Sequence, residues 1–194
     1  VANNKVYITT TDGHILALDA RTGAELWMSK GGPKLAYSGN APFIAGGKII
    51  ITGNRPGGYI AAYDEQTGEF QWIWKSLPEK GEPEYATWGG AKPQGGPIWI
   101  GGTYDPESKL LFYGTGQPSP DWAGSGRPGI NLYGDCLVAL DITTGKLKWY
   151  YQATPHDTHD YDATEIIVAA DINYNGRPRK VVMQANRNGY FYIL

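Results

Sequence analysis

Three stretches of sequence decide the fold: ALDARTGAELW at residues 17–27, AYDEQTGEFQW at residues 62–72 and ALDITTGKLKW at residues 139–149. Each follows the pattern Ala-x-Asp-x-x-Thr-Gly-x-x-x-Trp. The pattern predicts a β-hairpin, because the Asp can accept hydrogen bonds from turn N–H groups and the Gly supplies a positive φ. We expect Asp19, Asp64 and Asp141 to be turn residues. The Trp begins the return strand and provides a large surface for packing against a neighbouring sheet.

Short apolar runs near the repeats predict further strands, which lie at residues 6–10, 14–18, 48–52, 59–63, 110–114, 137–140, 181–184 and 190–194. No stretch has a sustained helical period, and the runs indicate four-stranded antiparallel units. Radial repetition of such units is characteristic of a β-propeller. We therefore predict an all-β fold in which residues 1–194 form a partial propeller of about three to four blades. The chain is expected to be an internal fragment, incomplete at both ends, since so few blades do not close a ring.

The composition excludes several classes of protein. The chain has 27 Gly and 13 Pro among 194 residues, a proportion that does not suit a helical protein. Its net charge is −2, which argues against nucleic-acid binding as its main role. It contains one Cys and no long apolar run, so neither an internal disulfide framework nor a membrane-spanning helix is expected.

Four further segments carry a resemblance to a known family: WIGGTYDP at 99–106, YGTGQPSP at 113–120, TPHDTHDYD at 154–162 and NRNG at 186–189. Together with the tripled Trp repeat, they resemble the pyrroloquinoline quinone (PQQ) dehydrogenases of the methanol/ethanol dehydrogenase branch. The resemblance covers essentially the whole chain. It implies an eight-bladed quinoprotein propeller in the full protein, with the quinone on the axis and a site built from loops of several blades.

The resemblance assigns the central chemistry to Asp160, which aligns with the family's catalytic aspartate and metal ligand. A carboxylate is needed there, because hydride leaves the carbinol carbon only as the O–H proton is removed. Asp162 lies two residues later and would point to the same side of an extended segment. Both carboxylates could then bind one ion, an arrangement that resembles the lanthanide-dependent branch. The alternative for Asp162 is a solvated surface residue.

Four other residues complete the predicted site. Trp99 matches the tryptophan that stacks under the quinone, and Arg187 matches the cationic residue that contacts the quinone oxygens. Gln117 aligns with a metal-ligating Asn, and Asn54 lies in the loop where the family places a metal-ligating Glu. Both are departures from the family pattern, and an amide is a weaker ligand than a carboxylate for a hard cation. The quinone's own carboxylate would then supply much of the remaining negative charge.

The residues around the predicted site have less specific expectations. His156 and Asp157 are expected to hold their loop by hydrogen bonds. His159 replaces the Trp that usually precedes the catalytic Asp, which makes the substrate side more polar and methanol specificity less favoured. Residues 124–129 are predicted to form a flexible insertion that is either a rim or lid of the pocket or a plain surface loop.

The resemblance implies that the protein oxidises a primary or secondary alcohol by metal-assisted hydride transfer to PQQ. It further implies Ca²⁺ or a lanthanide ion, a small alcohol substrate, a cytochrome-type electron acceptor and a periplasmic location. The oligomeric state is left open, with a homo-oligomer among the options. The alternative function is a non-enzymatic propeller that acts as an assembly scaffold, which the absent Glu near Asn54 and the change to Gln117 favour.

Overall fold

The computed structural model describes residues 1–10, 12–32, 40–54 and 57–194, and this part is almost entirely β-structure. The strands are β1 (Lys5–Thr9), β2 (Ile15–Asp19), β3 (Glu25–Met28), β4 (Phe43–Ala45), β5 (Lys48–Gly53), β6 (Tyr59–Asp64), β7 (Phe70–Lys75), β8 (Thr103–Asp105), β9 (Leu110–Gly114), β10 (Cys136–Asp141), β11 (Leu147–Gln152), β12 (Val168–Tyr174), β13 (Arg177–Ala185) and β14 (Phe191–Ile193). Two short 3-10 helices complete the described elements, η1 (Pro83–Trp88) and η2 (Gly124–Gly126).

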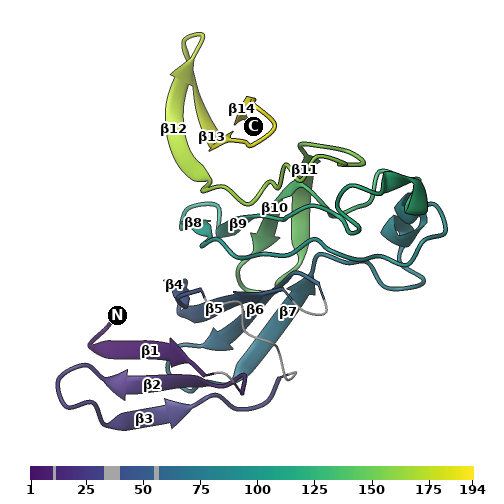
Figure 1. Ribbon diagram of the computed structural model, residues 1–194. Helices are drawn as coiled ribbons and strands as arrows, with labels where there is room; N and C mark the ends of the chain where they lie inside the picture. The colour runs from purple at the N-terminus through teal and green to yellow at the C-terminus, as the bar shows by residue number, and fades with distance from the viewer. Residues whose placement is uncertain (11, 33–39, 55–56) are drawn as a thin grey trace.

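The strands form four antiparallel sheets, which follow one another in chain order (Figure 1). The middle two sheets have four strands each, in the orders β4-β5-β6-β7 and β11-β10-β9-β8. The first and last have three described strands each, β1-β2-β3 and β12-β13-β14. Each of the eight predicted apolar runs overlaps a strand, so the all-β prediction is confirmed. Four-stranded units are observed for the two middle sheets only.

The repeated turns have one common geometry. In each, an oxygen of the Asp accepts hydrogen bonds at 2.7 to 3.0 Å from the backbone N–H groups two and three residues later. The glycine that closes each turn has a φ between +70° and +74°. Across each hairpin the Trp pairs with the opening Ala, as Ala17 with Trp27, Ala62 with Trp72 and Ala139 with Trp149. The predicted turn role of the three Asp residues is confirmed.

Two of the tryptophans dock onto the glycine of the following sheet's repeated turn. A Cβ atom at Gly145 would lie 2.5 Å from the ring of Trp72, and one at Gly68 would lie 2.5 Å from the ring of Trp27. The indole Nε1 of Trp72 also donates a hydrogen bond to the carbonyl of Ile142 at 3.0 Å. Glycine therefore meets two requirements at this position, a positive φ and the absence of a side chain under the ring.

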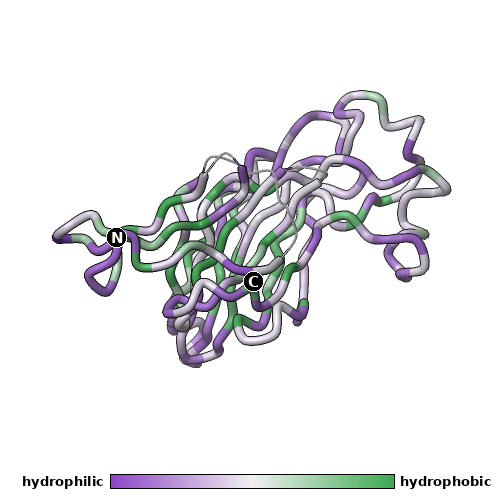
Figure 2. Tube along the Cα trace, turned by 90° about the horizontal axis from the view of Figure 1, so that it is seen from below, coloured by the Kyte–Doolittle hydropathy of each residue, from purple (hydrophilic) through white to green (hydrophobic). Residues whose placement is uncertain are grey.

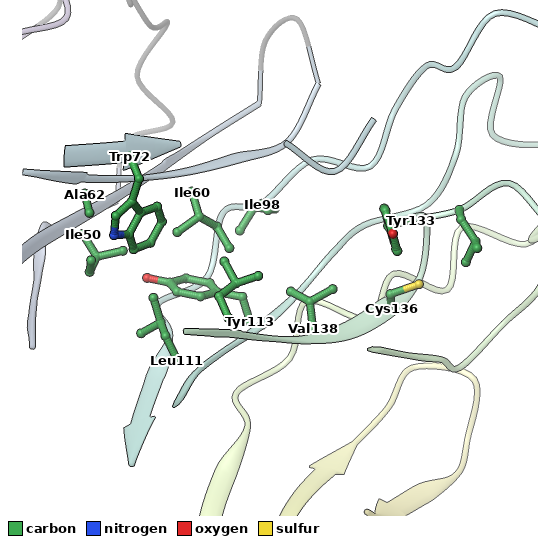
Figure 3. Close-up of a cluster of buried hydrophobic side chains, with 12 residues drawn as sticks. Ile50, Ile60, Ala62, Trp72, Ile98, Leu111, Tyr113, Tyr133, Cys136 and Val138 are labelled. Atoms are coloured by element: carbon green, nitrogen blue, oxygen red, sulfur yellow. The ribbon is translucent and has the colours of Figure 1, made fainter. Parts of the chain in front are cut away.

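Apolar side chains pack between neighbouring sheets, and alternate residues of a strand enter different layers. In β5, Ile50 packs toward the β8–β11 sheet, whereas Ile49 and Ile51 pack toward the β1–β3 sheet. Figure 3 shows the layer between the two middle sheets, where Trp72, Ile60, Tyr113 and Val138 come together. Figure 2 shows hydrophobic residues along the stacked strands and more hydrophilic ones in the surrounding loops. Alternate side chains of a strand point to opposite faces of its sheet, so both faces are apolar when sheets stack face to face.

The antiparallel order places the repeated turns and the predicted site residues at opposite ends of the sheets. The repeated turns join the second and third of the described strands of the first sheet, and the third and fourth strands of the middle sheets. The β9–β10, β11–β12 and β13–β14 connections leave from the other end, and in Figure 1 the longest connections extend to one side of the sheets. No helix in the described part of the chain is long and apolar enough to cross a membrane.

The steric effect of Trp72 on position 145 can be separated from the cost of a positive φ by comparing two Gly→Ala substitutions. Gly145→Ala should lower the free energy of unfolding by about 3 kcal/mol, because it adds a steric conflict with the indole to the cost of a positive φ. Gly176→Ala is the matched control, since Gly176 has a φ of +74° and no atom within 4 Å of its Cβ position. That control should lose only about 1 kcal/mol in urea denaturation of the full-length protein. Equal losses would show that the indole contact contributes nothing.

Candidate functional site

Five of the predicted site residues lie in connections that belong to three successive sheets. Trp99 lies between β7 and β8, and Gln117 follows β9. Asp160 and Asp162 lie in the β11–β12 connection, and Arg187 lies in the β13–β14 turn. These five residues surround one region at the same end of the sheets, as the contacts below show.

Asp162 is the centre of this arrangement. Its side chain is only 4% exposed. Oδ1 accepts a hydrogen bond from the backbone N–H of Gln117 at 3.0 Å, and Oδ2 accepts one from the guanidinium of Arg187. Burial raises the pKa of Asp162 to about 6, and the negative charge of Asp160 adds to this while the Gln117 N–H and Arg187 oppose it. The surface-residue alternative for Asp162 is therefore wrong.

Asp160 is the more accessible of the two acids, with 32% of its side chain exposed. Its Oδ2 lies 3.8 Å from Nη2 of the same Arg187 that binds Asp162. Both carboxylates lie beside one cationic group, the guanidinium of Arg187, but the alternation of an extended segment is not the cause. The segment is not extended, because Asp160 has a φ of +61° and Asp162 a φ of +41°. Arg187, rather than strand alternation, brings them together.

The loop that carries Asp160 is organised by Asp157, whose side chain is fully buried. Its two oxygens accept hydrogen bonds from the backbone N–H groups of His159 at 2.8 Å and Tyr161 at 2.7 Å. These two residues flank Asp160, so the carboxylate of Asp157 fixes the backbone on both sides of it. His156 uses Nδ1 to bond the carbonyl of Gly129 at 2.8 Å. The predicted structural role of His156 and Asp157 is supported by these bonds.

A glycine allows Trp99 and Asp162 to approach the same point. A Cβ atom at Gly116 would lie 2.7 Å from Oδ1 of Asp162, 2.8 Å from Cζ3 of Trp99 and 2.9 Å from Cγ of Pro97. Any larger residue at position 116 would displace one of these groups. Trp99 is half-buried. The sequence reasoning did not identify Gly116, although a glycine beside a predicted ligand is a usable signal.

Gln117 and Asn54 line one depression of about 340 Å³, together with Gln94, Gly95 and Ser119. Asn54 is exposed, and its Oδ1 accepts a hydrogen bond from the backbone N–H of Ile98 at 3.2 Å. Gln117 Oε1 is buried and has no hydrogen-bond partner among the described residues. The loop at 53–58 that contains Asn54 is described except for residues 55 and 56, which lie outside the described part.

The carboxylate and amide oxygens of the predicted ligands are of the type that a hard cation prefers, and one of them, Oε1 of Gln117, is a buried acceptor without a hydrogen-bond partner among the described residues. In the described residues, no group of three or more His, Cys, Asp or Glu side chains is placed to hold a metal ion. A cation here would therefore depend on amide oxygens and on the oxygens of a bound cofactor, besides Asp160 and Asp162. The oxygen chemistry of these residues suits such a combination, but Asp160 and Asp162 do not line the depression beside Gln117 and Asn54. The assignment of Asp160, Asp162, Gln117 and Asn54 as metal ligands stays a prediction.

Sequence reasoning missed a buried acid behind the site. Asp135 is 1% exposed, and neither of its carboxylate oxygens has a hydrogen-bond partner among the described residues. Burial raises its pKa to about 9, and the charges of Asp157 and Asp162 raise it further while Arg127 opposes them. Asp135 precedes β10 and looks like an ordinary turn residue in the sequence, so nothing local predicted its burial.

The predicted flexible insertion is instead packed against the site. Arg127, which lies within this insertion, is 1% exposed. Its guanidinium donates to the backbone carbonyl of Asp157, at the start of the loop that carries Asp160. Gly124 lies against the same loop, since a Cβ atom there would be 2.6 Å from Nε2 of His156 and 2.7 Å from Cγ2 of Thr158. Gly124 and Arg127 are buried against this loop, whereas Ser125, Gly126 and Pro128 are exposed, so the segment packs beside the loop on one side and faces outward on the other.

Comparison with known proteins agrees with this architecture. Residues 28–194 match the β-propeller domain of the glucose/ethanol/alcohol dehydrogenases, the PQQ family. The match covers most of the chain, so the chain belongs to this family. The described fold is accordingly part of a quinoprotein propeller.

Individual relatives show the same relationship. The chain is 40% identical to the quinohemoprotein alcohol dehydrogenase ADH IIB of Pseudomonas putida, over 98% of the chain and 31% of that protein. The structure of ADHIIG from Pseudomonas putida HK5 superimposes with a TM-score of 0.85 at 36% identity, covering 100% of this chain and 32% of that one. A europium-containing methanol dehydrogenase gives a TM-score of 0.81 at 29% identity, covering 100% and 38%. The chain thus spans about a third of the length of these relatives.

The buried acid leads to a prediction about stability and pH. Because the pKa of Asp135 is raised in the folded state, its contribution to stability is present below the unfolded pKa of about 4 and is lost as the pH rises toward 9. Asp135→Asn removes the carboxyl that becomes costly to ionise in the folded state as the pH rises. The free energy of unfolding of the variant, relative to that of the parent, should therefore increase by about 1 kcal/mol per pH unit between pH 5 and 8. Urea denaturation of the cofactor-free full-length protein measures the difference. A difference that does not change with pH would mean that Asp135 is already ionised.

Proposed function

We propose that the protein to which this chain belongs oxidises a primary or secondary alcohol to the carbonyl compound, by metal-assisted hydride transfer to pyrroloquinoline quinone. The observation that carries the proposal is the convergence of Asp160, Asp162 and Arg187 with Gln117 and Trp99, from three sheets, around one region. Support also comes from the family of the chain and from relatives that are named quinohemoprotein alcohol dehydrogenases. A scaffold propeller would have no need for this set of residues.

Asp160 is the group that would accept the hydroxyl proton of the alcohol. A general base must reach the proton that it removes, and the side chain of Asp160 is 32% exposed whereas that of Asp162 is 4% exposed. Both oxygens of Asp162 are already engaged, by the Gln117 N–H and by Arg187. Asp162 therefore holds the surrounding groups in place, and Asp160 is free to act on a substrate.

The remaining residues would bind the cofactors. Trp99 offers a partly exposed aromatic face for a planar quinone, and Arg187 offers a positive charge beside both acids. Asp160, Asp162, Gln117 and Asn54 offer oxygens to Ca²⁺ or a lanthanide ion. When bound, the quinone supplies a two-electron acceptor for the hydride, and the cation supplies Lewis-acid activation. The europium in the name of one structural relative supports the inclusion of lanthanides among the candidate ions.

The two residues that flank Asp160 in the chain are polar and aromatic, and we propose that they favour alcohols larger than methanol. The ring of His159 is 64% exposed and stacks on Tyr161, with 5.0 Å between the ring centroids and 12° between the planes. A planar pair of this kind offers a surface for a carbon skeleton and a polar edge for its other groups. We further propose a periplasmic location and a cytochrome-type electron acceptor, which accord with the bacterial quinohemoprotein relatives.

Asp160→Asn tests the assigned base. Asn tolerates the left-handed backbone that Asp160 adopts, so the loop should keep its conformation. The variant should bind PQQ as the parent does, but its kcat for a primary alcohol should fall by at least ~100-fold, because the proton acceptor is gone. Dye-linked steady-state kinetics on the full-length protein, reconstituted with PQQ and Ca²⁺ or a lanthanide, measures this.

The matched control is Asp171→Asn, the same substitution at an exposed position on β12 whose ion pair is with Lys180. Its kcat should equal that of the parent. If Asp160→Asn keeps most of the parental kcat, another group removes the proton and the assignment of Asp160 is wrong.

A further inference from the structure

The insertion between β9 and β10 contacts the loop that carries Asp160 at several places, through hydrogen bonds and packing. The backbone N–H of His156 bonds the carbonyl of Ile130 at 3.2 Å, and Nδ1 of His156 bonds the carbonyl of Gly129 at 2.8 Å. Gly124 lies against the side chains of His156 and Thr158. The loop at 154–162 therefore does not stand alone, since a segment about 30 residues earlier in the chain forms its support.

Arg127 is the centre of this support. Its guanidinium donates to the backbone carbonyls of Pro120 at 3.1 and 3.0 Å, of Asp121 at 3.0 Å and of Asp157. It also donates to the side-chain Oδ1 of Asn131 at 2.8 Å. The side chain of Asn131 in turn donates to the carbonyl of Arg127 at 3.1 Å. One planar group thus joins both ends of the insertion to the loop that carries Asp160.

The chemistry of this position requires arginine. A buried cation is costly unless its donors are satisfied and opposite charges lie nearby. All the nitrogens of the Arg127 guanidinium donate, and the negative charges of Asp157, Asp135 and Asp121 oppose the effect of burial. Lysine has a single nitrogen and cannot reach carbonyls on separate segments in a fixed plane.

The loop needs such support because its backbone is strained. His156 has a φ of +53° and Asp160 a φ of +61°, left-handed conformations that are unfavourable for residues with a side chain. They persist only where the surroundings impose them. Asp157 lies between these two residues, and it is bound from the insertion through its carbonyl and binds the loop through its carboxylate.

We propose that Arg127 is a positioning residue for the alcohol oxidation, which acts by holding Asp157 and through it the backbone on both sides of Asp160. The inference rests on the proposed function for its kinetic consequence, but its structural part does not depend on it. A displacement of the reacting carboxylate by about 1 Å is enough to lower a rate by about 100-fold. The insertion is then a fixed wall of the site rather than a lid.

Arg127→Met and Arg127→Lys in the full-length protein test the inference, with two measurements. The first is hydrogen exchange of the His159 and Tyr161 amides in the cofactor-free protein. Their protection should fall by at least ~10-fold in both variants, because Asp157 is released. The second is the kcat of the reconstituted protein, which should fall by about 100-fold in Arg127→Met with little change in KM. The milder Arg127→Lys carries the test if Arg127→Met does not fold.

A double-mutant cycle separates positioning of Asp160 from general destabilisation. In the Asp160→Asn background, Arg127→Lys should lower kcat by less than ~3-fold, because the group that it positions is already absent. Tyr7→Phe is the control, since it removes a buried hydrogen bond to Glu65 at 3.0 Å, far from the loop along the chain and in another sheet. The control should change neither kcat nor the exchange of the two amides.

The outcomes distinguish this inference from the proposed function. If the parent binds no quinone and oxidises no alcohol, the proposed function is wrong, and hydrogen exchange still decides whether Arg127 holds the loop. If the parent is active but both amides keep their protection in the Arg127 variants, the inference is overturned. Multiplicative kcat losses in the double-mutant cycle would also overturn it.

Discussion

The contact between an indole ring and a glycine of the next sheet is the interaction on which the rest of the structure depends. Trp27 covers Gly68 and Trp72 covers Gly145, so each of the first two sheets is fixed against its successor by the same contact. No side chain at these glycines could coexist with the ring, and the turn requires their positive φ as well. The relative position of the sheets is therefore specified by the sequence of the turns.

This fixed stacking determines where the chemistry can occur. The candidate residues belong to connections of different sheets, and none of those sheets could form the site alone. Gln117 meets Asp162, and Asp162 meets Arg187, where the last two sheets pack together through an apolar layer that includes Phe112 and Val182. The candidate site therefore depends on packing between sheets at least as much as on the sheets themselves, as is usual for sites on loops carried by a rigid scaffold.

The fold could be predicted almost completely from the sequence, because its signals are local and repeated. The Asp and Gly of each turn have physical roles that the sequence displays directly. The residues of the site were predicted from a resemblance; Asp160, Asp162 and Arg187 lie together in the structure, and their roles stay predictions. The reason given for that proximity was wrong, since the extended segment assumed for Asp160 and Asp162 is a left-handed one tied by Arg187.

What could not be predicted is the part of the site that arises from burial. Arg127 lies in an Arg-Pro-Gly sequence that is typical of an exposed turn, yet carbonyl groups from distant segments enclose it. Asp135 was equally ordinary in the sequence, and only the surrounding acids and the exclusion of water give it an unusual pKa. Backbone carbonyls are acceptors at every residue, so a cage of them has no sequence signature.

The central claim is that these loops form one oxygen-lined site for a cation and a quinone. A crystal structure of the full-length protein grown with PQQ and a lanthanide, with the ion located by its anomalous scattering, tests it most directly. The account predicts an ion about 2.3 to 2.6 Å from carboxylate oxygens of Asp160 and Asp162, with the quinone against the ring of Trp99. An ion bound elsewhere, or a quinone that does not touch Trp99, would contradict it.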